Sequence, residues 1–353
     1  MTHFEKIAAR LKDRGLDAML ITSEPGEFYA MGFHGEGAAL ITPDKTWYYT
    51  DSRYIEAAQQ IPGAEIILWT TEYPFRKQIA DLVKEHGIVK LGFEERYMSV
   101  ASHTDWTKAV EAQFVPASEL LTTLRQVKDA DELAAMKEAQ RITDEALLEI
   151  LNFLKPGLTE SEVAARLTYI MARKGAERNS FDPIVACGPN GSKPHAIPGP
   201  AVIQKGQFVT MDFGCVVGGY CSDMTRTVAI GQPSEEMELV YNTVLKAQLT
   251  GIATAHAGVT GKEVHEAAAK VIADAGYGEY FGHGFGHSLG IEIHEDPGFH
   301  LRNDKPIPAG ALLSAEPGIY LPGKFGVRIE DVILLTEGGC VDITHSPKQL
   351  IVL

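Results

Sequence analysis

Two aspartates eleven residues apart, Asp212 and Asp223, stand in the segment FVTMDFGCVVGGYCSDMTRTVAI, which runs from residue 208 to residue 230. Two strand-like runs flank a Val-Val-Gly-Gly centre, a pattern typical of a β-hairpin. A turn centred on Val217 and Gly218 places the two carboxylates directly opposite each other, with Cβ atoms about 4.5–5.5 Å apart. Two charges this close repel by roughly 3 kcal/mol at an effective dielectric near 20. A fold keeps such a pair if it shares a proton or binds cations; alternatively, a β-bulge shifts the register and each aspartate faces water.

Two glutamates and a histidine further along the chain also stand in apolar surroundings. Glu316 follows an apolar run, and Glu330 closes the strand-like segment GVRIED. A buried charge of this kind requires a partner. His287 lies in FGHGFGHSLGIEIHE, where glycines allow close approach of the backbone. A single histidine is more often a structural or surface group than a ligand, so the interpretation rests on the whole set.

Taken together, these side chains predict a site for two metal ions. The four carboxylates and one imidazole carry a negative charge that two divalent cations would cancel. Oxygen-rich ligation with one nitrogen and no thiolate favours Mn²⁺, Co²⁺, Zn²⁺ or Fe²⁺. The cysteines lack the spacing of a structural zinc site, and no EF-hand loop for calcium is present. The predicted metal ligands are Asp212, Asp223, His287, Glu316 and Glu330.

The elements that must position these residues fall into two regions. In the first region, strands alternate with helices, a pattern typical of a small α/β domain. We expect its strands at 16–22, 38–41, 47–50, 65–69 and 89–93, and its helices at 4–15, 53–60, 74–86 and 100–111. A long charged helix, expected at about 127–154 and ended by Pro156 and Gly157, opens the second region. The 353 residues suffice for two domains, which we expect at 1–124 and 125–353.

The second region contains an internal repeat. GLTESEV at 157–163 recurs as GVTGKEV at 258–264. Thr and Glu three residues apart form a capping box, so each copy should begin a helix at its threonine. Gly175 and Gly276 follow at equal spacing and are expected to end these helices.

A second pair of segments repeats in the same order. GQFVTMDFG at 206–214 parallels GALLSAEPG at 310–318, with the acid in the same place in both. We therefore expect two pseudo-symmetric halves, each contributing an acid to a shared centre.

Composition limits the class of partner and the compartment. A formal net charge of −15 argues against nucleic acid and anionic membranes as partners. No apolar run approaches the roughly 18 residues of a membrane span. The N-terminus lacks a signal-peptide pattern, and the four cysteines form no C-x-x-C pair. These features predict a cytoplasmic protein with no nucleic-acid or membrane partner.

The segment from about 127 to 353 resembles the pita-bread metallopeptidases, namely methionine aminopeptidase, aminopeptidase P and prolidase. The resemblance rests on the five predicted ligands in order, with Glu316 in AEPGIY and Glu330 in VRIED. The first region, including YTDSRY at 49–54, is similar to the creatinase-type domain of prolidases and aminopeptidases P. The resemblance implies a two-domain α/β fold, with a small N-terminal α/β domain and a C-terminal α+β pita-bread domain built on a pseudo-two-fold repeat.

The resemblance also implies roles for the ligands. Asp212 would bind one ion, Asp223 and Glu330 would bridge both, and His287 and Glu316 would complete the shell. A metal-bridging hydroxide would be the nucleophile, since bound metal can lower the pKa of water from 15.7 to about 7. The counterpart of Glu316 is also proposed to accept the proton of this water.

Other residues match family positions near the substrate. His195 in KPHAIPG and His294 in EIHED resemble the histidines that stabilise the tetrahedral intermediate and protonate the leaving nitrogen. His283 matches a histidine near the substrate amine; for all three, a structural role is the alternative. Arg302 corresponds to an arginine that captures the substrate carboxylate in some prolidases, and is otherwise a surface residue. Arg328 is expected to support the metal carboxylates.

The function implied is hydrolysis of the bond before proline in Xaa-Pro dipeptides, as in prolidase. This bond lacks an N–H group and needs a dedicated pocket. The alternative is an Xaa-Pro aminopeptidase (aminopeptidase P) that accepts Xaa-Pro-Yaa and longer peptides. A non-catalytic binding protein or a metal-free, creatinase-like hydrolase on this fold would not need all five ligands. The resemblance further implies two ions per subunit, with Mn²⁺ expected first, short proline-containing peptides as substrates, and a homodimer.

Overall fold

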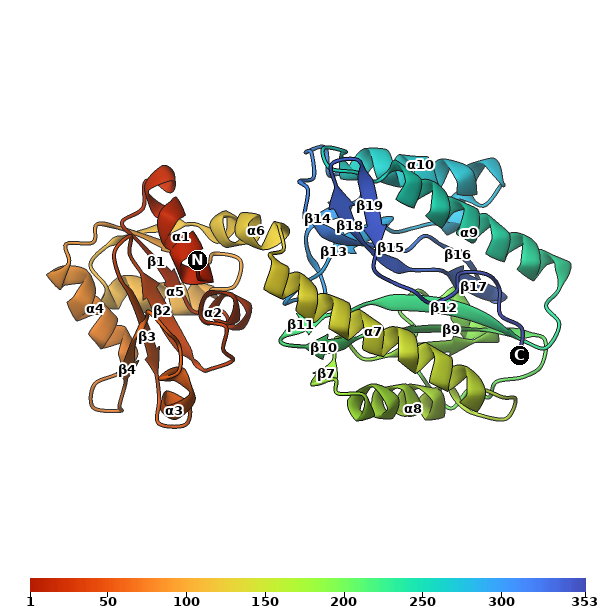
Figure 1. Cartoon of the computed structure of the whole chain (residues 1–353), viewed down its shortest axis with the longest axis horizontal. Coiled ribbons are helices and arrows are strands. Elements are labelled where there is room, and N and C mark those ends of the chain that lie inside the picture. The colour runs from red at the N-terminus through yellow and green to blue at the C-terminus, as the bar shows by residue number, and fades with distance from the viewer. The chain divides into compact units, whose positions relative to one another are not determined.

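The computed structural model describes residues 1–353, which form two compact units, Met1–Arg125 and Gln126–Leu353. Figure 1 shows both, coloured from red at the N-terminus to blue at the C-terminus. No helix combines the length and the apolar character that crossing a bilayer requires.

The first unit is built on a six-stranded mixed sheet with the strand order β4-β3-β2-β1-β5-β6. The strands are β1 (Ala18–Ile21), β2 (Gly37–Ile41), β3 (Thr46–Thr50), β4 (Glu65–Leu68), β5 (Lys90–Phe93) and β6 (Gln113–Pro116). The helices are α1 (His3–Leu11), α2 (Glu24–Met31), α3 (Ile55–Ala58), α4 (Phe75–Glu85), α5 (Val100–Ala109) and α6 (Ser118–Gln126), the last ending one residue into the second unit, with a 3₁₀ turn η1 at Lys12–Arg14. All five expected strands and four expected helices are present, and α2, α6 and β6 are additional.

The second unit has four long helices, and its strands form four separate sheets. Its helices are α7 (Ala130–Phe153), α8 (Glu160–Arg173), α9 (Glu235–Thr254) and α10 (Gly261–Asp274), with 3₁₀ turns η2 (Gly188–Ser192) and η3 (Gly278–Tyr280). Its first strands are β7 (Arg178–Asn179), β8 (Ile184–Cys187), β9 (Gln207–Phe213), β10 (Cys215–Val217), β11 (Tyr220–Cys221) and β12 (Met224–Ile230). The later strands are β13 (Gly286–Ser288), β14 (Glu295–Phe299), β15 (Leu312–Ala315), β16 (Gly318–Leu321), β17 (Phe325–Arg328), β18 (Asp331–Thr336) and β19 (Gly339–Asp342).

Helices cover both sides of these strands. Within the second unit, Figure 1 shows α7 and α8 on one side and α9 and α10 on the other. One apolar core lies between α7, α8 and the β12-β9-β8 sheet, and a second lies between α9, α10 and the strands from β15 to β18. The central strands are therefore held from both sides, as residues that carry a rigid site require.

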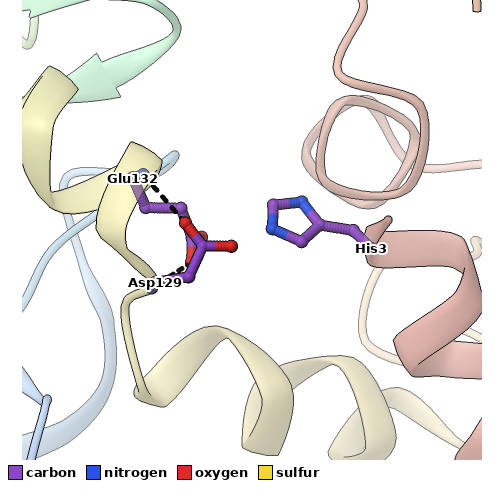
Figure 2. A group of neighbouring side chains, drawn as sticks. All are labelled: His3, Asp129 and Glu132. Atoms are coloured by element: carbon purple, nitrogen blue, oxygen red, sulfur yellow. Dashed lines mark hydrogen bonds between the residues drawn. The ribbon is translucent and has the colours of Figure 1, made fainter. Parts of the chain in front are cut away.

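The start of α7 is fixed by a capping box. Asp129 accepts a hydrogen bond from the Glu132 amide (3.0 Å), and the Glu132 carboxylate accepts one from the Asp129 amide (2.8 Å). Figure 2 shows both bonds as dashed lines; His3, also drawn there, belongs to the first unit. Glu132 additionally accepts a hydrogen bond from the Tyr220 hydroxyl (3.0 Å), which ties α7 to β11.

The predicted internal repeat is confirmed. Both α8 and α10 begin at a complete Thr–Glu capping box, and Gly175 and Gly276 follow them with left-handed φ values of 105° and 86°. The backbone outside the helices repeats as well. Gly157 donates to the carbonyl of Ile203 (2.9 Å), and Gly258 donates to that of Ile307 (2.8 Å).

The predicted hairpin is present, but its register was predicted wrongly. Asp212 pairs with Thr225, because the turn is formed by Gly218 and Gly219 and not by Val217 and Gly218. Both glycines have left-handed φ values, 57° and 77°, which the tight hairpin turn requires. The error is two residues, and the side-chain period of a strand is also two. Asp212 and Asp223 therefore still face the same side, although they are not directly opposed.

Candidate active site

The five predicted metal ligands line one cleft of about 1050 Å³. Asp212 lies in β9, Asp223 directly precedes β12, and His287 lies in β13. Glu316 directly follows β15, and Glu330 lies between β17 and β18. Strands from both halves of the second unit therefore deliver side chains to one place.

Three of these residues bring ligand atoms particularly close together. Single donor atoms of Asp223, His287 and Glu330 all lie within 4.8 Å of one another. The His287 Nε2 atom is 3.6 Å from Asp223 Oδ2 and 3.3 Å from Glu316 Oε1. The donor set is thus carboxylate oxygen with one imidazole nitrogen.

Three buried carboxylate oxygens in this cluster have no hydrogen-bond partner: Asp212 Oδ1, Asp223 Oδ1 and Glu330 Oε1. Two of these carboxylates have their other oxygen held. Arg328 forms an ion pair with Asp212, and the Thr225 hydroxyl donates to Glu330 (2.7 Å). Since unpartnered buried carboxylate oxygens are costly, an arrangement that leaves one on each of three neighbouring acids fits cation ligands.

Electrostatics also indicates that the cluster is short of positive charge. Burial raises the pKa of Asp223 well above its usual range, and the neighbouring Glu330 and Asp212 raise it further. Burial likewise raises the pKa of Glu330, with Glu316 and Asp212 contributing. Arg328 supplies one positive charge against four carboxylates, so divalent cations fit the residues present.

His287 is oriented as a ligand would be. Its Nδ1 atom donates to the carbonyl of Ser288 (3.1 Å), which leaves Nε2 facing the acids. Burial lowers its pKa. The neutral imidazole is the form that binds metal, so both features prepare this side chain for coordination.

Arg328 lies at the centre of a buried hydrogen-bond network. Besides the Asp212 carboxylate, it contacts the Thr225 hydroxyl (3.0 Å) and the Tyr320 hydroxyl (2.9 Å). Tyr320 lies 2.9 Å from His283 Nε2, and His283 Nδ1 lies 2.8 Å from the carbonyl of Gly284. Nδ1 can only donate to that carbonyl, so in the neutral imidazole Nε2 accepts from the Tyr320 hydroxyl. Burial lowers the pKa of His283, which favours this neutral form.

The other histidines and the predicted arginine also line the cleft. His195 is exposed, on the loop that follows η2, and His294 packs edge to face against His287 with ring centroids 4.4 Å apart. Burial and the neighbouring His287 lower the pKa of His294. Arg302 is exposed at the cleft, beyond β14. The structure therefore brings all ten predicted site residues to one unit, and none of them lies elsewhere.

Sequence reasoning missed Tyr320 and Thr225. Tyr320 stands in AEPGIY, the segment that identified Glu316, and a buried tyrosine there needs a partner for its hydroxyl. Thr225 could have been found from the correct hairpin register, because it is the residue paired with Asp212.

Comparisons with known proteins agree with this geometry. A model described as metallopeptidase family M24 matches residues 134–337, and one described as the creatinase/prolidase N-terminal domain matches residues 4–127. The chain belongs to metallopeptidase family M24. The mixed α/β fold with a creatinase-type domain followed by a pita-bread domain is accordingly that expected from the sequence.

Individual relatives of this M24 enzyme match along their whole length. It is 43% identical to the peptidase YqhT of Bacillus subtilis, over 99% of both chains. Among solved structures, it is similar to an Xaa-Pro dipeptidase from Bacillus anthracis, with 42% identity, a TM-score of 0.96 and 99% of each chain covered. It is also similar to an X-Pro aminopeptidase from Thermotoga maritima, with 36% identity and a TM-score of 0.92, over 98% of this chain and 100% of the other. Membership in this family implies divalent metal ions.

Proposed function

We propose that this M24 enzyme hydrolyses the bond before proline in Xaa-Pro dipeptides, with two divalent metal ions. The observation that carries the proposal is the group of three unpartnered carboxylate oxygens beside the imidazole of His287, in one cleft. The Xaa-Pro specificity is supported by the names of the similar enzymes from Bacillus anthracis and Thermotoga maritima.

In this proposal the ions are held by Asp212, Asp223, His287, Glu316 and Glu330. Such ions, when bound, polarise a substrate carbonyl and lower the pKa of water, which supplies a nucleophile at neutral pH. Arg328 orients one oxygen of Asp212, and Thr225 orients one oxygen of Glu330, so that the remaining oxygens face the cleft.

Three further groups handle protons and charge in this proposal. Glu316 accepts a proton from the attacking water at a carboxylate whose pKa is raised by burial, which favours proton uptake. His195 and His294, which line the cleft, stabilise the oxyanion and donate a proton to the leaving proline nitrogen. His283 faces the substrate amine from the Arg328–Tyr320 network.

Arg302 is the proposed determinant of peptide length. It is exposed at the cleft, so its guanidinium can pair with the carboxylate of a dipeptide. If it does so, a tripeptide would place its carboxylate beyond reach. Xaa-Pro aminopeptidase activity is the second candidate, because the similar Thermotoga maritima enzyme carries that name.

The test compares Ala-Pro, Ala-Pro-Ala and Ala-Ala as substrates of one preparation loaded with Mn²⁺ or Co²⁺. We expect proline release from Ala-Pro and less cleavage of Ala-Pro-Ala. Hydrolysis of Ala-Ala without hydrolysis of Ala-Pro would refute the proline assignment, and preferred cleavage of the tripeptide would favour the aminopeptidase.

The ligand assignment has its own test. Asp223→Ala should remove both ions, as measured by elemental analysis. Asp182→Asn is the matched control, because Asp182 is an exposed carboxylate that lines the same cleft without belonging to the cluster. Undiminished metal in the Asp223 variant would contradict the assignment.

We also propose Mn²⁺ as the native ion, a homodimer as the assembly, the cytoplasm as the compartment, and domain limits of 1–124 and 125–353. Metal analysis of protein purified without added metal tests the ion, and mass measurement in solution tests the assembly. Cell fractionation tests the compartment, and limited proteolysis tests the domain limits.

A further inference from the structure

The loop that carries His195 has little regular structure of its own. It runs from the end of β8 through η2 to Val202, and its sequence, GPNGSKPHAIPGPAV, is rich in proline and glycine. His195 makes no hydrogen bond within the chain, and its imidazole is exposed in the cleft. Its position must therefore be set by whatever holds the loop.

Glu160, the first residue of α8, is fully buried and holds both ends of this loop. Its Oε1 atom accepts hydrogen bonds from the Cys187 amide (2.8 Å) and the Asn190 side chain (3.0 Å). Its Oε2 atom accepts one from the Gly199 amide (3.1 Å). No lysine or arginine pairs with it, and its hydrogen-bond partners are groups of residues 187–199. Hydrogen bonds to an ionised acceptor are about twice as strong as neutral ones.

The backbone of α8 completes the clamp. The Ser161 amide donates to the carbonyl of Gly199 (3.1 Å), and the Glu160 amide donates to that of Ala201 (3.1 Å). Between the two ends, Arg328 donates to the carbonyl of Pro194 (3.2 Å), next to His195. The loop is thus fixed at both ends by α8 and once near its middle.

The pseudo-symmetric half shows that helix formation does not require this carboxylate. The counterpart of Glu160 is Gly261, the first residue of α10. A Cβ atom there would lie 2.1 Å from the Gly298 carbonyl oxygen, so no side chain fits. Nevertheless α10 begins with the same capping box and has the same length, 14 residues, as α8. Glu160 therefore serves a purpose other than starting its helix.

We infer that Glu160 is a positioning residue for His195, acting by clamping the loop of residues 187–199 onto the start of α8. The inference rests on the proposed function, because it assigns Glu160 a role only through His195. It extends that function to a side chain that contacts neither the substrate nor any proposed metal ligand.

The test uses Glu160→Gln in the metal-loaded enzyme. An amide keeps the shape but turns one acceptor into a donor that faces the N–H groups of the loop. We expect hydrogen exchange at the amides of Cys187 and Gly199 to accelerate at least about tenfold, since both lose a charged acceptor. We expect kcat for Ala-Pro to fall about 10- to 100-fold, as for a displacement near 1 Å of a catalytic group. KM and metal content should change little.

A double-mutant cycle with His195→Ala separates positioning from general damage. If Glu160 acts through His195, Glu160→Gln costs little further kcat once His195 is absent. Glu162→Gln is the matched control: it lies two residues away in α8 and also replaces a carboxylate by an amide, but its partner is Thr159 and a glutamine can still close that capping box. It should leave loop exchange and kcat at wild-type values.

Each outcome decides a separate point. Unchanged exchange in the loop of Glu160→Gln would overturn the clamp, and multiplicative losses in the cycle would overturn the action through His195. If Glu160→Gln does not fold, Asn190→Ala can replace it, because it removes one hydrogen-bond donor to Glu160 from the loop. It should accelerate loop exchange and lower kcat in the same way, but to a smaller extent. If the wild-type enzyme does not cleave Ala-Pro, the proposed function fails, while loop exchange still tests the clamp.

Discussion

Asp223→Asn should stabilise the metal-free enzyme and abolish its stabilisation by metal. Ligand atoms of Asp223 and Glu330 lie within 4.8 Å of each other in the buried cluster. At that distance two unit charges repel by about 3.5 kcal/mol at an effective dielectric of 20. Proton uptake and the nearby Arg328 relieve part of this repulsion. We therefore expect the free energy of unfolding of the metal-free enzyme to rise by about 1–3 kcal/mol when one charge is removed.

The assay is thermal unfolding with a chelator and with Mn²⁺. For a domain of this size, 1 kcal/mol shifts Tm by about 2–4 °C, so the metal-free variant should melt several degrees above the metal-free wild type. When metal is present at 100 times its Kd, the free energy of unfolding of the wild type should rise by about 2.7 kcal/mol, and that of the variant should hardly change. A metal-free variant that melts below the wild type, or one that keeps the metal-dependent rise, would refute the reasoning.

The Asp223 carboxylate should also make the stability of the metal-free enzyme depend on pH. The pKa of Asp223 is raised in the folded protein above its ordinary value of 3.8, so the metal-free folded state binds the proton more tightly than the unfolded state. This stabilisation is complete below the ordinary pKa and is lost as pH rises through the raised one. The fall in stability over that range should be smaller in Asp223→Asn, as measured by urea unfolding at several pH values with a chelator present.

Four further substitutions test other parts of the structure. Arg302→Ala should raise KM for Ala-Pro about 10- to 100-fold through loss of a charge-assisted bond worth roughly 1.5–3 kcal/mol, with less effect on Ala-Pro-Ala; equal effects on both peptides would remove its proposed role. Asp331→Asn should lower the free energy of unfolding in urea by about 3–5 kcal/mol, because the buried Arg226, which lies 2.7 Å from Asp331, loses its anionic partner. A loss below 1 kcal/mol would contradict this. Thr159→Ala and Thr260→Ala should each cost about 1 kcal/mol of stability, since each removes the cap of one helix; a difference between them would show that the halves are not equivalent.

The sequence sufficed for features whose signals are local. Apolar periodicity predicted the strands of the first unit, and paired threonine and glutamate predicted both α8 and α10. Helix α2 was not predicted from the sequence, because the Glu-Pro-Gly segment at its start is typical of a turn. There the Ser23 cap is itself held by Glu94, which accepts from the Ser23 hydroxyl (2.6 Å) and lies 71 residues away. No local pattern reveals a contact of that kind.

In the candidate site, too, some residues could be predicted from the sequence and others could not. The types and order of the five proposed ligands were readable from the sequence, because acids in apolar strands are rare and costly. The turn at Gly218 and Gly219 was predicted one residue too early, which shifts the pairing by two residues and hid the pairing of Thr225 with Asp212. The segment AEPGIY pointed to Tyr320 but not to its partners, and nothing local pointed to Glu160, since both side chains act through hydrogen bonds to residues 8 or more positions away in the chain.

The two halves of the second unit differ where function requires it. Both begin a helix at a capping box and both deliver an acid from a strand that follows a left-handed glycine, Gly206 or Gly310. The halves differ at the residue that follows the capping threonine. In one half this residue is the buried Glu160, and in the other it is Gly261, against which the backbone of Gly298 packs. A repeat that served folding alone would have no reason to bury a carboxylate in one copy only. The asymmetry therefore indicates that the Glu160 carboxylate is retained for the loop it holds, and with it for His195.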